Sequence, residues 1–356
     1  MKPVSVQVPL DGDIDCSPSY LFDYSDLYKT NAREAGLQWF HDATFGLGIH
    51  FGLYSLLGKG ERALADGVLT PDDYKRLAAK LEGIHFDAMD IVEFTIANGM
   101  RYINFSVRTA DGFSLFNTKL SDYNCTKSPA RRDFLGELAS CCEYHGIGLC
   151  LNYSHGRDWS RPEGYPNAPA QNVEMGRQIA YQEFMLGQLQ ELLTQYGPIA
   201  AICLDGIDVP QSSPALKEYG CQDLYDFVHH LQPQVLLSYN QGLLGTEDFF
   251  SCVDNLPAED ADDAIKGFIH KQTDKPVEIR ISLTPEAWGY HAERAGKHLR
   301  VEQVWNELSK ARAAQCNLLV NTALMPDGSL DLEDIQTLLE VGKRIEEHGY
   351  PNSELV

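Results

Sequence analysis

Short apolar runs of strand length alternate with longer helical segments along most of this sequence. Seven runs occur, at residues 46–52, 102–108, 148–154, 199–206, 235–240, 277–283 and 317–323. Most of them are continuously apolar, as is typical of parallel strands that are buried on both faces. Strands that alternate with helices predict a parallel sheet with helical crossovers. Seven or eight such units in about 300 residues favour a closed, (β/α)8-like TIM barrel over an open doubly wound sheet.

The sequence between the runs carries helix-boundary residues. Thr70-Pro71-Asp72-Asp73 predicts a capped helix start. Ser128-Pro129 predicts the start of the next long helix, and Gly146 its end. Asp331 and Asp334 are candidate caps for the last helix. We expect one domain, with residues 1–35 as an extended, irregular N-terminal arm and residues 36–356 as the α/β barrel.

Composition limits the partners of this chain. The formal net charge is −22, from 51 acidic and 29 basic residues, so the surface repels nucleic acid and anionic lipid. No window approaches the ~18 continuous apolar residues of a membrane span, and the N-terminus has no signal-like apolar run. The nine cysteines show no zinc-site spacing, which favours reduced thiols and a cytoplasmic location. No phosphate loop, dinucleotide fingerprint or metal-ligand spacing occurs, so we expect no cofactor.

Candidate catalytic residues follow the predicted strands, because barrels of this class place their active sites at the carboxyl ends of the strands. The fourth run ends at Asp205. A carboxylate at the tip of an apolar strand costs several kcal/mol to desolvate unless it is paired or reacting. Asp205 is therefore the leading catalytic candidate, with helix capping as the alternative. His50, in the first run, is either a site residue or a core histidine hydrogen-bonded at both nitrogens.

Aromatic side chains lie beside several of the same strand ends. Tyr153 and Trp159 accompany the end of the third run, and Trp288 and Tyr290 follow the sixth. Such side chains could line a sugar site or pack in the core and at its rim.

Taken in order, these motifs resemble the α-L-fucosidases of glycoside hydrolase family 29, from about residue 38 to residue 350. Residues 45–55, FGLGIHFGLYS, resemble the family's first strand, FGIFIHWGLYS. Five further stretches follow the family pattern at fitting spacing. They are Asp111–Phe116 with Arg131–Asp133, Tyr153-Ser154 with Asp158-Trp159, Leu204–Gly206, Trp288–Tyr290, and Asn317–Asn321 with Asp327-Gly328. Each stretch alone is weak evidence for the family, but six stretches in the same order are specific for it. The resemblance is to the short bacterial, cytoplasmic members that lack a C-terminal β-sandwich.

The resemblance implies a retaining, double-displacement mechanism with two carboxyl groups about 5–6 Å apart. Asp205 falls on the nucleophile position and should be ionised, close to His50 and Tyr153. Asp254 falls on the acid/base position, and Glu247 and Glu286 are the alternative candidates for this role.

The family pattern also implies a set of side chains that contact the sugar. In this sequence they are His50, Glu61, Asp111, Tyr153, Trp159 and Trp288.

Four departures from the family pattern concern side chains that contact the sugar in the family. Residues 107–113 lack both histidines of the family's KHHDGF, and the family's Glu-Trp reads Glu61-Arg62. The family's tryptophan two residues before the nucleophile is replaced by Cys203. The family's Asn-Asp-Arg after the fifth strand is replaced by Asn240-Gln241-Gly242. Hydrogen bonds from a site to sugar hydroxyls discriminate strongly between sugars, so these departures bear on the substrate.

Three functions follow from this pattern. The first is an exo-acting α-L-fucosidase that releases a terminal 6-deoxy sugar from a fucosylated saccharide. The second is a glycosidase for another sugar, whose carboxylate or sulfate would meet Arg62 and Arg108, unless these arginines form solvent-facing salt bridges. The third is an inactive, carbohydrate-binding barrel. We also expect a homo-oligomer, because a barrel without the appended sandwich leaves apolar outer surface for a second subunit.

Overall fold

The computed structural model describes residues 17–161, 175–206, 221–240, 246–253 and 275–351. Eight parallel strands form one sheet in the order β5-β4-β3-β2-β1-β8-β7-β6. The strands are β1 (Phe45–His50), β2 (Tyr102–Arg108), β3 (Gly148–Ser154), β4 (Ala201–Asp205), β5 (Leu236–Tyr239), β6 (Phe250–Val253), β7 (Val277–Ser282) and β8 (Asn317–Ala323). A parallel bridge between Asn240 and Ser251 joins the two edges. The sheet is therefore a nearly closed barrel, which confirms the predicted fold class.

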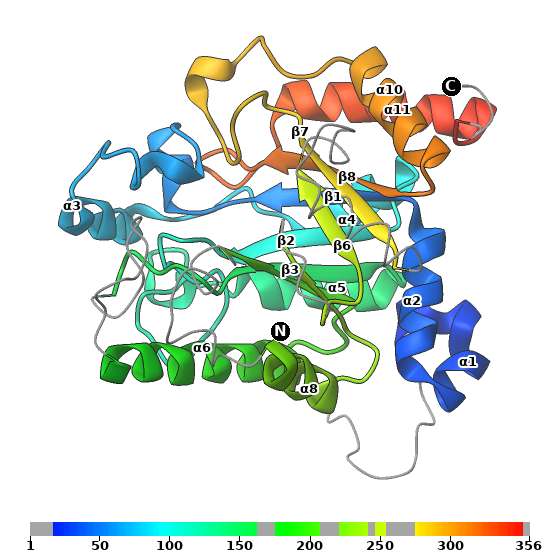
Figure 1. The fold of residues 1–356 in the computed structure, drawn as a ribbon. Coiled ribbons are helices and arrows are strands. Elements are labelled where there is room, and N and C mark those ends of the chain that lie inside the picture. The colour runs from blue at the N-terminus through cyan, green and yellow to red at the C-terminus, as the bar shows by residue number, and fades with distance from the viewer. Residues whose placement is uncertain (1–16, 162–174, 207–220, 241–245, 254–274, 352–356) are drawn as a thin grey trace, which may run out of the picture.

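Helices surround this barrel (Figure 1). Figure 1 shows α10 and α11 on one side of the strands, α6 and α8 on the opposite side, and α3 at the far end from α1 and α2. The α-helices are α1 (Ser25–Thr30), α2 (Ala32–Ala43), α3 (Pro71–Lys75), α4 (Ala88–Ala97), α5 (Phe134–His145), α6 (Met175–Gln195), α8 (Cys221–Leu231), α10 (Val301–Ala313) and α11 (Leu332–His348). Short 3-10 helices are η1 (Ser19–Tyr24), η2 (Leu53–Leu57), η3 (Glu61–Ala63), η4 (Arg76–Lys80), η5 (Cys125–Lys127) and η6 (Ala292–Arg294).

Three of the four predicted helix boundaries are confirmed. The Thr70 hydroxyl accepts a hydrogen bond from the Asp73 amide at 3.2 Å, and Asp331 caps α11. Gly146 ends α5 with φ of +68°, a backbone conformation that glycine adopts without strain.

The predicted start of α5 at Ser128 is wrong. The helix begins at Phe134, after Asp133, whose carboxylate accepts the Gly136 amide at 3.0 Å. The Ser128 hydroxyl instead donates to the Cys125 carbonyl at 2.7 Å. A Ser-Pro pair also suits a turn, and here the turn precedes a separate Asp cap.

The described part of the N-terminal arm, residues 17–35, is helical rather than extended and irregular. Its apolar side chains pack with Trp39 and Phe40 of α2 against the end of the barrel where the strands begin. The Trp39 ring lies so close to Gly148, the first residue of β3, that a Cβ there would sit 2.2 Å from it. The arm therefore closes the amino-terminal end of the barrel.

A polar network fills the middle of the barrel. Arg280 of β7 is buried, and its Nε donates to the Glu278 carboxylate at 2.7 Å. The other end of the guanidinium reaches β3 and β4, 2.6 Å from Cys203 Sγ and 3.4 Å from Asn152 Oδ1. The Tyr102 hydroxyl donates to the second oxygen of Glu278 at 2.7 Å. This network ties β7 to the strands across the barrel.

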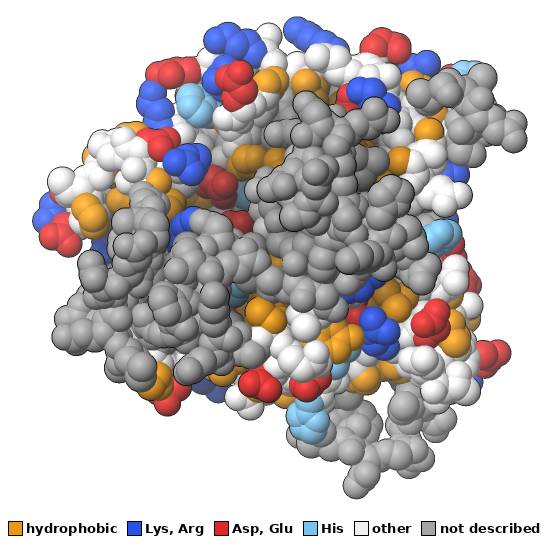
Figure 2. Space-filling model, in the orientation of Figure 1, with side chains coloured by type: hydrophobic (Ala, Val, Ile, Leu, Met, Phe, Trp, Pro, Cys, Tyr) orange, Lys and Arg blue, Asp and Glu red, His pale blue; other side chains and the backbone are white. Residues whose placement is uncertain are grey.

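The outer surface carries mixed charge. Figure 2 shows acidic and basic side chains interspersed across the described part of one face. Among the helices of the described residues, none is both long and apolar enough to span a bilayer.

Candidate active site

Asp205 is the last residue of β4 and lies in register with Ser154, the last residue of β3. Its carboxylate is half-buried and accepts a hydrogen bond from Asn240 Nδ2 at 3.0 Å. Its backbone carbonyl accepts hydrogen bonds from the His155 amide, the Gly156 amide and the His155 ring. Asp205 is thus an anchored carboxylate at the carboxyl end of the barrel, where this fold places its chemistry.

A second group of predicted site residues meets at the end of β1. His50 Nδ1 lies 2.6 Å from Asn321 Oδ1, and its Nε2 lies 3.5 Å from a carboxylate oxygen of Glu61. The ring of Trp288 lies 5.3 Å from the His50 ring, and the Trp288 carbonyl accepts the Glu61 amide at 2.8 Å. His50, Glu61 and Trp288 therefore form one polar and aromatic cluster. The cluster suits a sugar, which offers hydroxyl groups to polar side chains and C–H faces to an aromatic ring.

Asp111 has a structural role in place of the predicted sugar contact. It is buried, and its carboxylate accepts hydrogen bonds from Tyr74, Thr109 and the Phe113 amide, at 2.8, 3.1 and 3.0 Å. Burial raises the pKa of Asp111 to about 6, against these hydrogen bonds, which favour its charged form. The residue therefore organises the loop after β2.

Tyr153 faces away from the barrel interior, so its predicted contact with sugar and with the Asp205 carboxylate is wrong. Successive side chains of a strand point to opposite faces, and Asp205 is paired with Ser154, the neighbour of Tyr153. The Tyr153 hydroxyl donates to Gln188 of α6 at 2.8 Å, in the layer between strands and helices. Tyr153 is a core residue.

Arg108 is buried rather than available to an anionic sugar or to solvent. Its guanidinium pairs with the buried Asp158 and donates to the Ser154 carbonyl at 2.7 Å. Arg62, in contrast, is exposed and lies 3.4 Å from Asp66, as a solvent-facing salt bridge would. Neither arginine gives a reason to prefer an anionic sugar.

Trp159 joins two of the strand-end loops. Its backbone amide donates to the Ala110 carbonyl at 2.8 Å, and its side chain is half-buried. The indole Nε1 is buried and has no hydrogen-bond acceptor among the described residues. Trp159 thus remains a candidate sugar contact, since a buried indole N–H normally finds an acceptor.

The three candidates for the acid/base residue differ in position. Asp254 lies outside the described residues. Glu247 is buried and lies 3.2 Å from Lys275 Nζ. Glu286 is exposed and pairs with Arg294 at 2.7 Å. An acid/base catalyst must reach the leaving group, whereas both Glu247 and Glu286 are engaged in ion pairs with other side chains.

A family profile decides the identity of this barrel. The profile described as Alpha-L-fucosidase matches residues 22–350. This chain belongs to the α-L-fucosidase family.

Individual α-L-fucosidases are similar over most of this chain. The Arabidopsis thaliana protein "Alpha-L-fucosidase 1" is 27% identical over 72% of this chain and 51% of its own length. The structure of α-L-fucosidase isoenzyme 1 from Paenibacillus thiaminolyticus is 26% identical, with a TM-score of 0.75 over 91% of this chain and 80% of that one. The fucosidase AlfC from Lactobacillus casei, solved with its α-L-fucose product, is 26% identical, with a TM-score of 0.72 over 88% of this chain and 98% of that one. The chain spans about half the length of the first curated relatives.

Three polar residues of this fucosidase-family site were not among the predicted site residues. They are His155 and Asn240, which hydrogen-bond to Asp205, and Asn321, which contacts His50. His155 and Asn240 directly follow strand ends and Asn321 lies in the last half of β8, and this position is the signal that could have singled them out.

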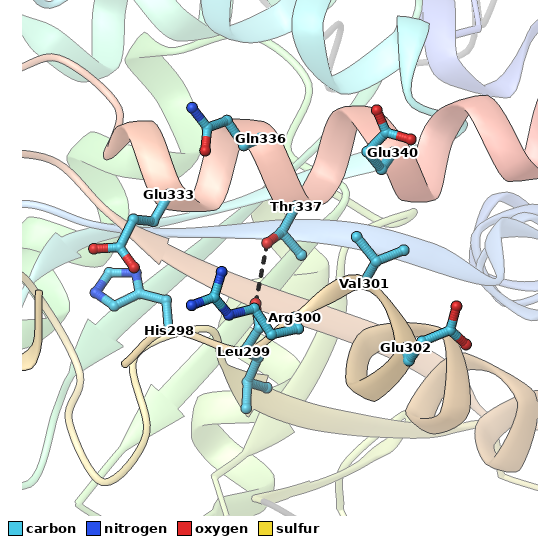
Figure 3. A pocket seen from close by; sticks show the side chains of 9 residues that line it. All are labelled: His298, Leu299, Arg300, Val301, Glu302, Glu333, Gln336, Thr337 and Glu340. Carbon is cyan, nitrogen blue, oxygen red and sulfur yellow. Dashed lines mark hydrogen bonds between the residues drawn. The ribbon is translucent and has the colours of Figure 1, made fainter. Parts of the chain in front are cut away.

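A separate groove of about 280 Å³ lies between the start of α10 and α11 (Figure 3). Figure 3 shows His298 beside Glu333, and these two with Asp331 bring possible ligand atoms within 4.8 Å of one another. Burial alone would lower the pKa of His298, but its 2.7 Å contact with Asp334 raises it. Because Asp334 already engages His298 Nδ1, this cluster fits an internal hydrogen-bond and ion-pair network.

Proposed function

We propose that this member of the α-L-fucosidase family is a retaining exo-glycoside hydrolase that releases α-L-fucose from fucosylated saccharides. The observation that carries the proposal is the Asp205 carboxylate, anchored by Asn240 at the carboxyl end of a barrel of this family. The solved relatives named above are α-L-fucosidases, and one of them contains the α-L-fucose product.

In the proposed mechanism, Asp205 attacks the anomeric carbon and the leaving oxygen takes a proton from Asp254. Water, deprotonated by the same residue, then releases the sugar with net retention. Asp254 is proposed because it directly follows β6 in the sequence, and parallel strands bring their carboxyl ends to one end of a barrel. Glu61 and His50 would hydrogen-bond to sugar hydroxyls beside Trp288.

A panel of 4-nitrophenyl glycosides tests the activity. The proposal expects hydrolysis of the α-L-fucoside, with little or none of uronides and other sugars. Turnover of another glycoside alone would point to a different sugar. Binding of fucose without turnover of any substrate would point to a carbohydrate-binding barrel.

We also propose that the protein is cytoplasmic and forms a homo-oligomer. The cysteines of the described residues are free, as in a reducing compartment. Phe22 and Tyr144 are 77% and 80% exposed on the outside of the barrel, where a second copy could cover them. Light scattering should give a multiple of the 39.8 kDa chain mass, and a mass near 39.8 kDa would exclude the oligomer.

A further inference from the structure

The loop after β3 holds the peptide group of Asp205 with three hydrogen bonds. The Asp205 carbonyl oxygen accepts the His155 amide at 3.1 Å, the Gly156 amide at 3.2 Å and the His155 Nδ1 at 2.8 Å. His155 is 3% exposed, so the ring contact is shielded from water. Three protein donors therefore satisfy this carbonyl group, in keeping with the rule that buried backbone polar groups are paired.

The ring contact also defines the state of His155. A carbonyl oxygen can only accept, so Nδ1 must carry a proton and act as the donor. The imidazole therefore has the Nδ1–H tautomer whenever it is neutral.

Two glycines make this arrangement possible. Gly156 packs against the backbone of Gly206, and a Cβ on Gly156 would lie 1.9 Å from the Gly206 carbonyl oxygen. Gly206 has φ of +86°, a conformation that glycine adopts readily. The close approach of the two glycines therefore leaves no room for a side chain at Gly156.

The side chain of Asp205 is held separately. Asn240 Nδ2 donates to one carboxylate oxygen, and the Asn240 backbone amide donates to the Leu204 carbonyl at 2.8 Å. The loop after β3 therefore fixes the backbone of Asp205, while the residue after β5 fixes its carboxylate.

We infer that His155 is a positioning residue, whose Nδ1–H holds the Asp205 peptide group so that the carboxylate points at the anomeric carbon of a bound sugar. This inference rests on the proposed function, in which Asp205 is the nucleophile. Small misplacements of a reacting group are costly, since about 1 Å can reduce a rate ~100-fold. Loss of one of the three donors should therefore slow the attack step by about tenfold or more, with little change in sugar binding.

A 2-deoxy-2-fluoro-fucosyl fluoride isolates that step. A carboxylate oxygen of Asp205 forms a bond to the anomeric carbon while the C–F bond breaks and fluoride leaves with the electron pair. The fluorine at C2 slows the next step, so the glycosyl-enzyme accumulates. The rate constant of inactivation measures the attack, the inhibition constant measures binding, and mass spectrometry of the labelled peptide identifies the nucleophile.

His155→Asn and His155→Gln form a matched pair. The asparagine amide nitrogen takes approximately the place of imidazole Nδ1 and keeps the donor, whereas the glutamine nitrogen takes the place of Nε2 and loses it. We expect His155→Gln to reduce the inactivation rate constant at least about tenfold and His155→Asn to reduce it less than about threefold. The inhibition constant should change less than about threefold in both variants. His230→Gln, on the exposed side of α8, is the control and should match the wild type.

Equal rate constants for the two His155 variants, or a wild-type rate for His155→Gln, would overturn the inference. Rates are normalised to the fraction of protein that takes the label, so partial misfolding does not imitate slow attack. If His155→Gln does not fold, the tautomer of His155 in the wild type is read from the ¹⁵N chemical shifts of histidine-labelled protein. The spectrum of His155→Asn identifies which signal belongs to His155. An Nε2–H tautomer at His155 would overturn the inference. A label on a peptide without Asp205 would instead reject the nucleophile of the proposed function.

Discussion

The buried pair of Arg280 and Glu278 predicts a large loss of stability when one charge is removed. Arg280→Met keeps most of the side-chain volume but leaves the Glu278 carboxylate with the Tyr102 hydroxyl as its remaining hydrogen-bond donor among the described side chains. Breaking a buried ion pair by removing one partner costs about 3–5 kcal/mol. The unfolding entropy is about 2.1 cal/mol/K per residue, or about 0.75 kcal/mol/K for 356 residues. The expected decrease in Tm is therefore about 4–7 °C.

A double-mutant cycle followed by differential scanning calorimetry tests this reasoning. Glu278→Gln alone should destabilise by a similar amount, because a guanidinium cannot shed its charge inside the barrel. The variant that carries both substitutions buries no charge and should melt within about 2 °C of the wild type. A single Arg280→Met variant that melts within about 1 °C of the wild type, or effects that simply add, would refute the account of the barrel interior.

Three further predictions concern other described residues. Because burial raises the pKa of Asp111 to about 6, the folded state holds the proton of this carboxyl group more tightly than the unfolded state, and stability falls as pH rises from about 4 to 6. Asp111→Asn should flatten that part of a Tm–pH curve, and an unchanged curve would contradict the prediction. Burial alone would raise the pKa of Asp248, but His229 helps hold it below its usual value. The ionised Asp248 carboxylate therefore stabilises the fold, and this contribution is lost as pH falls below about 4. Asp248→Asn should cost about 2 kcal/mol at neutral pH by urea denaturation and reduce the acid sensitivity, and full stability would argue against the role. Gly156→Ala should lower kcat on an aryl α-L-fucoside at least about tenfold, since its Cβ would meet the Gly206 carbonyl at 1.9 Å; a wild-type kcat would refute this.

The barrel was predictable from sequence because its buried strands are continuously apolar. Seven strands coincide with the seven apolar runs, with ends that differ by a few residues. The exception is β6, Phe250–Val253, which has four residues and includes the polar Ser251. Such a short strand is stabilised by pairing with β7, and pairing is a tertiary property that no local pattern contains.

The site was predictable in part, because strand ends and family motifs mark positions but not directions. Asp205 ends β4, and His50, Glu61 and Trp288 form one group at the end of β1, while their roles toward a sugar stay predictions. Tyr153 was misplaced because a strand's alternation gives two possible faces, and only its register with β4 decides between them.

The hydrogen bonds of the site were less accessible still. His155 contacts Asp205 across 50 residues of sequence, and Asn321 contacts His50 across 271. These pairs exist only once the barrel has closed, so sequence spacing alone does not predict them.

Chemical rescue of Asp205→Ala shows whether Asp205 is the nucleophile. We expect this variant to lose turnover of aryl α-L-fucosides, because no carboxylate remains to attack the anomeric carbon. Added azide, which is small enough to take the vacated position, should restore turnover and give fucosyl azide of inverted configuration. Wild-type turnover by Asp205→Ala without azide would contradict the claim.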